Sequence, residues 1–134
     1  MNIKRYLIAV IVIFIAFQLM DMVIHGMLLM QTYESLPSLW RQDMMSMMWV
    51  MYLTGLAMSF LFVYIFTKGY ENNGILEGLR FGLIIGLFMQ IPAAFGQFVV
   101  YPIPFSLAIQ WFIYGTIEFI IAGIITAAIY RPKV

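Results

Sequence analysis

Four long apolar stretches dominate the pattern of hydrophobic and polar positions along the chain. They cover approximately residues 6–30, 44–67, 79–100 and 105–130. A helix needs about 20 predominantly apolar residues to cross the hydrocarbon core of a membrane, and each stretch is long enough. The stretches are apolar on all sides, whereas the strands of a membrane barrel alternate apolar and polar positions. The sequence therefore predicts an all-α polytopic membrane protein, a bundle of four transmembrane helices.

Short connections separate the predicted helices, and none is long enough to form a second domain. We therefore expect residues 1–134 to form a single transmembrane domain. Lysine and arginine are enriched in cytoplasmic loops, so their distribution predicts the orientation. Arg41 alone falls at one end of the predicted bundle, which places both termini in the cytoplasm. The basic residues at the opposite, cytoplasmic end are Lys4, Arg5, Lys68, Arg80, Arg131 and Lys133.

The amino-acid composition excludes several classes of protein function. Hydrophobic residues make up 64% of the chain and charged residues 10%, against about 25% charged in soluble domains. The formal net charge of +1 gives no electrostatic basis for binding nucleic acid. The chain contains no cysteine, which excludes thiolate catalysis and cysteine-ligated metals. Catalytic triads, phosphate-binding loops and HExxH motifs are also missing from the sequence, so we expect no enzyme activity and no cofactor.

A stripe of glycines marks the third predicted helix. Gly74, Gly78, Gly82 and Gly86 recur every four residues and so share one helix face. Small residues at this spacing let two helix backbones approach closely in lipid. We expect the stripe to pack against another helix of the same bundle. The alternative is an interface with a second copy or with another membrane subunit. Pro92 is expected to kink this helix, and its last turns to be irregular.

Ionisable groups inside the predicted spans need an explanation, since a charge at the bilayer centre costs roughly 2.5–3.5 kcal/mol. At 1.5 Å per residue from the cytoplasmic ends, Asp21 lies ~22 Å deep and Glu118 ~18 Å deep. The two acids are therefore expected in one layer. Because desolvation disfavours a carboxylate, at least one of them should be protonated near neutral pH.

Three predicted helices each carry a polar stripe, because the polar residues within each helix follow at intervals of three, four or seven residues and so share a face. They predict a buried polar core, which is either a structural hydrogen-bonded network or a site for a proton or ligand. Its predicted members are Gln18, Asp21, His25, Gln90, Gln97, Gln110, Tyr114 and Glu118.

Methionine is unusually frequent, with 12 residues. Thioethers and an imidazole together suit Cu(I), which makes His25, Met44 and Met48 weak candidates for a metal site. Methionine more commonly fills irregular apolar space. We therefore predict no metal site.

Three segments carry a resemblance that covers nearly the whole chain. They read YESLPSLWRQDM, YIFTKGYENNGILEGLRFGLIIGL and WFIYGTIEFIIAGIITAAIYRP. These segments resemble those of small uncharacterised bacterial four-helix integral membrane proteins. The resemblance implies a location in the bacterial cytoplasmic (inner) membrane and assigns no functional residue.

Small size, little mass outside the membrane and a glycine face favour a non-enzymatic accessory or assembly subunit of a larger membrane complex, or a self-associating bundle. The alternative is a small proton- or ion-coupled transporter or channel that uses Asp21, His25 and Glu118. A further alternative is a protein that binds a lipid-soluble cofactor or quinone between its helices. The expected partners are the lipid bilayer and either other membrane subunits or a second copy.

Overall fold

The computed structural model describes residues 1–131 and is built from helices throughout that range. Four helices are long and apolar enough to cross a membrane, which confirms the predicted all-α class and the four predicted helices. Lys133, one of the basic residues used to predict orientation, lies outside the described residues. The elements are α1 (Ile3–Val23), the π-helical turn η1 (Ile24–Leu28), α2 (Met30–Glu34), the 3₁₀ turns η2 (Pro37–Leu39) and η3 (Met44–Met47), α3 (Met48–Lys68), α4 (Ile75–Val100) and α5 (Phe105–Ile129).

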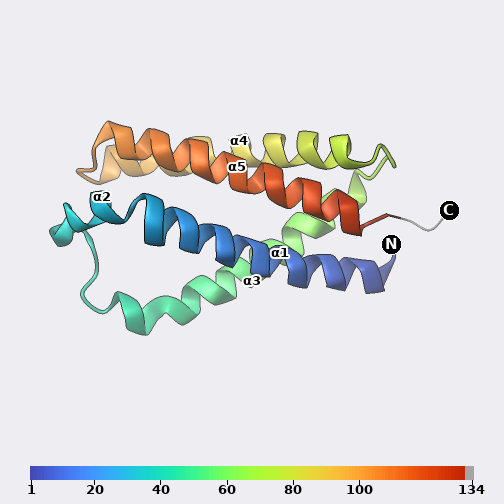
Figure 1. Ribbon diagram of the computed structural model, residues 1–134, viewed down its shortest axis with the longest axis horizontal. Helices are drawn as coiled ribbons and strands as arrows, with labels where there is room; N and C mark the ends of the chain where they lie inside the picture. The colour runs from blue at the N-terminus through green and yellow to red at the C-terminus, as the bar shows by residue number, and fades with distance from the viewer. Residues whose placement is uncertain (132–134) are drawn as a thin grey trace.

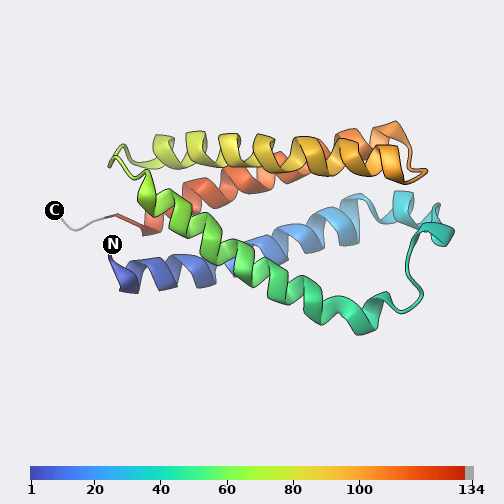
Figure 2. The same ribbon diagram turned by 180° about the vertical axis from the view of Figure 1, so that it is seen from behind.

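The long helices run up and down between two ends of the molecule (Figure 1). The N-terminus, the α3–α4 loop and the last residues of α5 share one end, which we call the terminal end. The short helix α2 and the α4–α5 turn lie at the other, which we call the α2 end. Helix α3 crosses α1 and diverges from it toward the α2 end (Figure 2). This half of α3 is exposed, as shown by Trp49 and Met51, each at 62%.

Helices α4 and α5 form the most extensive contact in the bundle. Gly78 and Gly82 of α4 are buried against the α5 backbone, so that a Cβ on Gly78 would overlap the carbonyl oxygen of Gly123. A Cβ on Gly82 would lie 2.7 Å from Ile120 Cα. Close approach therefore depends on the missing side chains.

The glycine stripe is shorter than predicted. Gly86 continues it, since a Cβ there would lie 3.2 Å from Thr116 Cα. Gly74 does not, because it precedes α4 as the N-cap, and no described atom lies within 4 Å of its Cβ position. Its φ of 71° instead places it in the left-handed region, which glycine adopts without strain. Gly74 thus turns the chain into α4.

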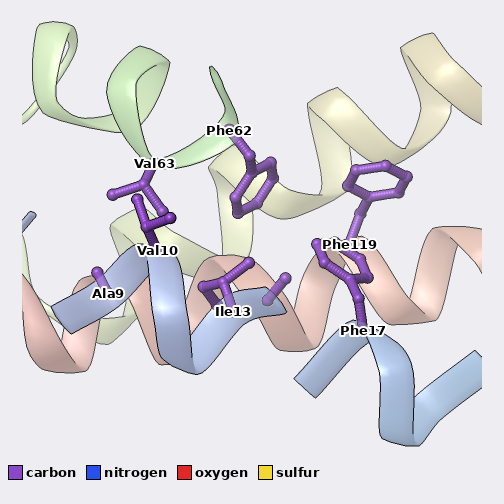
Figure 3. Packing of buried hydrophobic residues seen from close by; sticks show 8 residues of the cluster. Ala9, Val10, Ile13, Phe17, Phe62, Val63 and Phe119 are labelled. Carbon is purple, nitrogen blue, oxygen red and sulfur yellow. The ribbon is translucent and has the colours of Figure 1, made fainter. Parts of the chain in front are cut away.

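Aromatic and branched side chains join α1 to the α4–α5 pair (Figure 3). Phe17 of α1 and Phe62 of α3 meet Phe119 of α5, with ring centroids 5.4 and 5.7 Å from that of Phe119. The edge-to-face and tilted arrangements are those that aromatic quadrupoles favour. Ile13 and Val63 are fully buried beside them. This cluster closes the middle of the bundle.

The irregular backbone lies in a different helix from the one predicted. Helix α4 continues without interruption through Pro92 to Val100, so the expectation of irregular last turns is wrong. The first span instead changes to π-helical geometry at Ile24, where the amide of Leu29 donates to the carbonyl of Ile24 over 2.9 Å. The wider turn places the end of this span, including His25, out of the regular helical register.

Candidate functional site

Two carboxyl groups from different helices come close together where α1 contacts α5. Glu118 lies on the buried face of α5 and is 8% exposed. Asp21 on α1 lies close enough to act on Glu118 electrostatically, and its own side chain is 45% exposed. A carboxylate has no donor, so a hydrogen bond between the two groups requires a proton on one of them. Oε1 of Glu118 is buried and has no partner among residues 1–131. The unpartnered oxygen of Glu118 and the nearby Asp21 carboxyl make this pair the candidate site of the bundle.

No lysine or arginine neutralises this pair within the described part of the chain. Arg41 pairs with Asp43 at 2.9 Å and Arg80 with Glu71 at 3.9 Å, and both pairs lie in or beside loops. Two adjacent anions in a low-dielectric interior repel each other strongly. Sharing one proton removes that repulsion.

His25 connects the acid pair to the α2 end. Its Nε2 lies 3.7 Å from Oδ1 of Asp21, and its Nδ1 is hydrogen-bonded to the Tyr33 hydroxyl. The Tyr33 oxygen in turn accepts a bond of 2.7 Å from Nε1 of Trp111 on α5. An indole only donates, so the Tyr33 hydroxyl is free to donate its proton to Nδ1 of neutral His25. Nε2 then carries the hydrogen and faces Asp21.

Two tryptophans hold Tyr33 in place. Besides the bond from Trp111, Nε1 of Trp40 donates to the Tyr33 carbonyl over 3.1 Å, and the Tyr33 and Trp40 rings lie 4.9 Å apart. The Tyr33 ring also stacks on the His25 ring at 5.8 Å with an interplanar angle of 12°. The π-turn and α2 return the chain over the bundle end, so that Tyr33 reaches back to His25. The contacts of Tyr33 thereby set the position of the His25 ring.

The structure separates the remaining predicted core residues from this cluster. Gln18 packs toward α3, with its Nε2 3.2 Å from a Cβ built on Gly55. The amide of Gln90 covers Gly115 at the α4–α5 interface. Gln110 is half-buried, and Tyr114 packs in an apolar group that includes Ile24 and Leu107. These polar residues lie at several different helix contacts.

Three predicted members of the buried core are not buried. Gln97 is exposed on α4, and the side chains of His25 and Asp21 are 46% and 45% exposed. Spacing along one helix places residues on a common face, but it does not say which part of that face another helix covers. The structure leaves Gln97 uncovered, and it places His25 at the edge of the bundle.

Sequence reasoning did not select Tyr33 and Trp111. Tyr33 falls in a predicted loop, and Trp111 falls in a span that is apolar on all sides. The polar tip of a tryptophan usually finds a partner when it is buried, which is the signal that could have singled out Trp111. Its partner, 78 positions earlier in the chain, follows only from the fold.

The three candidate metal ligands, His25, Met44 and Met48, do not share one set of neighbours. Met44 lies exposed on η3 and Met48 begins α3, while the polar neighbours of His25 are Asp21 and Tyr33. Within residues 1–131, no group of three or more histidine, aspartate or glutamate side chains is placed to hold a metal.

The cluster brings together two carboxyls, an imidazole and a phenol, and each of these groups can bind and release a proton. Tyr33, His25, Asp21 and Glu118 follow one another from the α2 end into the bundle. Comparison of the chain with protein-family models, with curated proteins and with solved structures finds no match.

Proposed function

We propose that the chain is an integral protein of a bacterial cytoplasmic membrane, with both termini in the cytoplasm. Four apolar helices of sufficient length support insertion. The orientation is supported by the basic residues of the terminal end, Lys4, Arg5, Lys68, Arg80 and Arg131, against Arg41 at the α2 end. In this orientation Tyr33 and His25 lie toward the outer surface.

Within that membrane, we propose that the protein is a small, non-enzymatic, proton-coupled transporter or channel. The observation that carries this proposal is the Asp21–Glu118 carboxyl pair at the contact of α1 with α5, in which Glu118 is buried, Asp21 is half-exposed and neither carboxyl pairs with a lysine or arginine of the described chain. Intramembrane carboxyls without a charge partner are costly, and in membrane proteins they mark proton and ion pathways.

The neighbouring groups give the pair access to the α2 end. A proton on Tyr33 or His25 can reach Asp21 through adjacent groups and then Glu118. Toward the terminal end the path meets the aromatic cluster of Phe17, Phe62 and Phe119, which contains no proton donor or acceptor. We infer that this cluster is the barrier, and that transfer across it needs a movement of α1 or α3 relative to α5.

The accessory-subunit interpretation receives less support from the geometry. One of its supports in the sequence is a glycine face available to a partner, whereas Gly78, Gly82 and Gly86 are covered by α5 of the same chain. A lipid-soluble cofactor would need a cavity beside the polar residues, whereas the pockets between α3 and α4 and around Arg5 lie at the terminal end. Purification in mild detergent, followed by mass spectrometry, would reveal a protein partner or bound cofactor.

Proton flux into liposomes tests the proposal. The purified protein is reconstituted with a pH-sensitive dye inside, and a potassium gradient with valinomycin sets the membrane potential. We expect wild-type vesicles to acidify faster than empty ones, and Asp21→Asn and Glu118→Gln to reduce the rate at least tenfold, because an amide does not exchange a proton. Glu34→Gln, at an exposed position of α2, is the matched control and should keep the wild-type rate.

The result that contradicts the proposal is equally specific. Wild-type vesicles that acidify no faster than empty ones, with the protein folded and inserted, would exclude a proton pathway. Equal rates for wild type, Asp21→Asn and Glu118→Gln would exclude this site as its route. In both cases the pair would be a structural network.

A further inference from the structure

A pocket of about 230 Å³ opens at the terminal end, apart from the carboxyl pair. It lies where the start of α1, the end of α3, the α3–α4 loop and the end of α5 come together. This is the end at which the apolar spans begin and finish, and hence the level of the membrane–water interface if the helices cross the bilayer. The residues that line it are Met1, Asn2, Arg5, Thr67, Tyr70, Tyr130 and Arg131.

Two guanidinium groups give the pocket its charge. Arg5 and Arg131 are both close enough to Tyr70 to act on its hydroxyl electrostatically. Neither arginine forms an ion pair with a carboxylate of residues 1–131. Arg5 and Arg131 are far apart in the sequence, and the fold of the bundle brings these two cations together at one pocket.

Acidic groups in the neighbourhood are already engaged. The Glu77 carboxylate, which also acts on Tyr70, is buried and accepts backbone hydrogen bonds from Glu71 and Asn73 at 2.7 and 2.8 Å. Glu71 in turn lies 3.9 Å from Arg80. Neither carboxylate lines the pocket. The electrostatic character of the pocket is therefore cationic.

Two tyrosine rings and a backbone amide form part of the wall of the pocket. Tyr130 is 7% exposed, and its hydroxyl accepts a bond of 3.3 Å from the Asn2 amide. The Tyr70 and Tyr130 rings pack edge to face at 5.5 Å. The first turn of α1 also lies here, and the positive end of its dipole adds to the attraction for an anion.

We propose that this pocket binds the phosphate of an anionic phospholipid headgroup. Guanidinium groups pair with phosphate oxygens through two parallel hydrogen bonds, and basic pockets between transmembrane helices on the cytoplasmic side bind such headgroups. The acyl chains would lie along the exposed apolar side chains near this end, including Ile3 at 64% and Ile65 at 49% exposure. The inference rests on the proposed membrane insertion and orientation, and it is independent of the proton pathway.

Lipid titration of the full-length protein in a neutral detergent tests the site. Phosphatidylglycerol and phosphatidylcholine of equal chain length are added separately, and bound lipid is counted by native mass spectrometry while thermal unfolding is followed in parallel. We expect one phosphatidylglycerol to bind in preference and to raise the unfolding temperature. Arg5→Gln and Arg131→Gln should each weaken binding about fivefold, since a basic residue near an anionic lipid contributes roughly this factor.

Arg80→Gln is the matched control, because Arg80 lies at the same end but faces Glu71 outside the pocket. If it weakens binding as much as Arg5→Gln and Arg131→Gln do, the attraction is a general charge effect and the pocket is not a site. Equal binding of phosphatidylcholine also overturns the proposal.

Inorganic phosphate distinguishes a lipid from a soluble ligand. If phosphate alone raises the unfolding temperature as much as phosphatidylglycerol, and this effect is lost in Arg5→Gln, the pocket takes free phosphate and the lipid assignment is wrong. We expect millimolar phosphate to have no such effect, because the free anion lacks acyl chains that add apolar burial. These results are separate from the liposome assay, so either proposal can fail alone.

Discussion

Gly78 of α4 lies so close to Gly123 of α5 that a Cβ on either residue would overlap the backbone carbonyl oxygen of the other. The relationship is reciprocal, so two helices that follow each other in the chain meet backbone to backbone. In lipid, where apolar side chains gain nothing by leaving water, such close packing is a main source of helix association. The α4–α5 hairpin therefore forms the rigid half of the bundle, onto which α1 and α3 pack.

This contact predicts different results for two glycines of the same helix. Gly82→Ala places a Cβ against the Phe119 carbonyl, so the helices must separate and the free energy of unfolding should fall by about 1–3 kcal/mol. Gly96→Ala should leave stability unchanged or slightly higher, because no described atom lies within 4 Å of its Cβ and alanine favours helix. Thermal unfolding in detergent measures both. Equal stability of the two variants would contradict the packing.

A double-mutant cycle tests the bond between Trp111 and Tyr33. Trp111→Phe and Tyr33→Phe each remove one partner and keep an aromatic ring, so they should show a coupling of about 0.5–1.5 kcal/mol in unfolding free energy. Trp49→Phe, at an exposed position of α3, is the control and should show no coupling with Tyr33→Phe. Additive effects of the first pair would mean that the bond does not form in solution.

Tyr33 also predicts a dependence of stability on pH. Burial raises the pKa of Tyr33 above its ordinary value of 10.0, although the bond from Trp111 opposes the shift. Because the folded state holds this proton more tightly than the unfolded state, the stabilisation is complete below about pH 10 and is lost as the pH rises through the folded-state pKa.

Thermal unfolding between pH 8 and 12 provides the measurement. The wild-type unfolding temperature should fall more steeply above pH 10 than that of Tyr33→Phe. Trp111→Phe should raise the pKa of Tyr33 further, since it removes the donor that stabilises the phenolate. Identical profiles for wild type and Tyr33→Phe would show that Tyr33 is not buried as described.

Cysteine labelling tests the proposed orientation, and the absence of native cysteine makes single-cysteine variants simple to interpret. Ser35→Cys, in the loop after α2, should react with an impermeant maleimide added to intact cells. Gly69→Cys, at the terminal end, should react only after the membrane is opened. Gly69 suits this purpose because no described atom surrounds its Cβ position, whereas Asn72 has a φ of 63° that disfavours cysteine. Labelling of Gly69→Cys in intact cells would reverse the topology.

The sequence predicted the long helices closely because their signal is local. The second predicted span, residues 44–67, corresponds to η3 and α3, and the fourth, residues 105–130, to α5. A run of apolar side chains indicates a spanning helix whatever its neighbours are. The same local reasoning predicted irregular turns after Pro92, where α4 is regular, and missed the π-turn at Ile24–Leu28, although that turn contains Gly26.

The chain by itself determined the number of long helices, their approximate ends and the faces on which Gly82, Asp21 and Glu118 lie. Only the tertiary structure decided that Gly82 faces α5, that Asp21 meets Glu118, and that the loop brings Tyr33 to His25. Periodicity fixes directions around one helix axis, whereas a contact depends on the rotation and height of two helices together. Those are set by side chains far apart in the chain, so no local pattern records them.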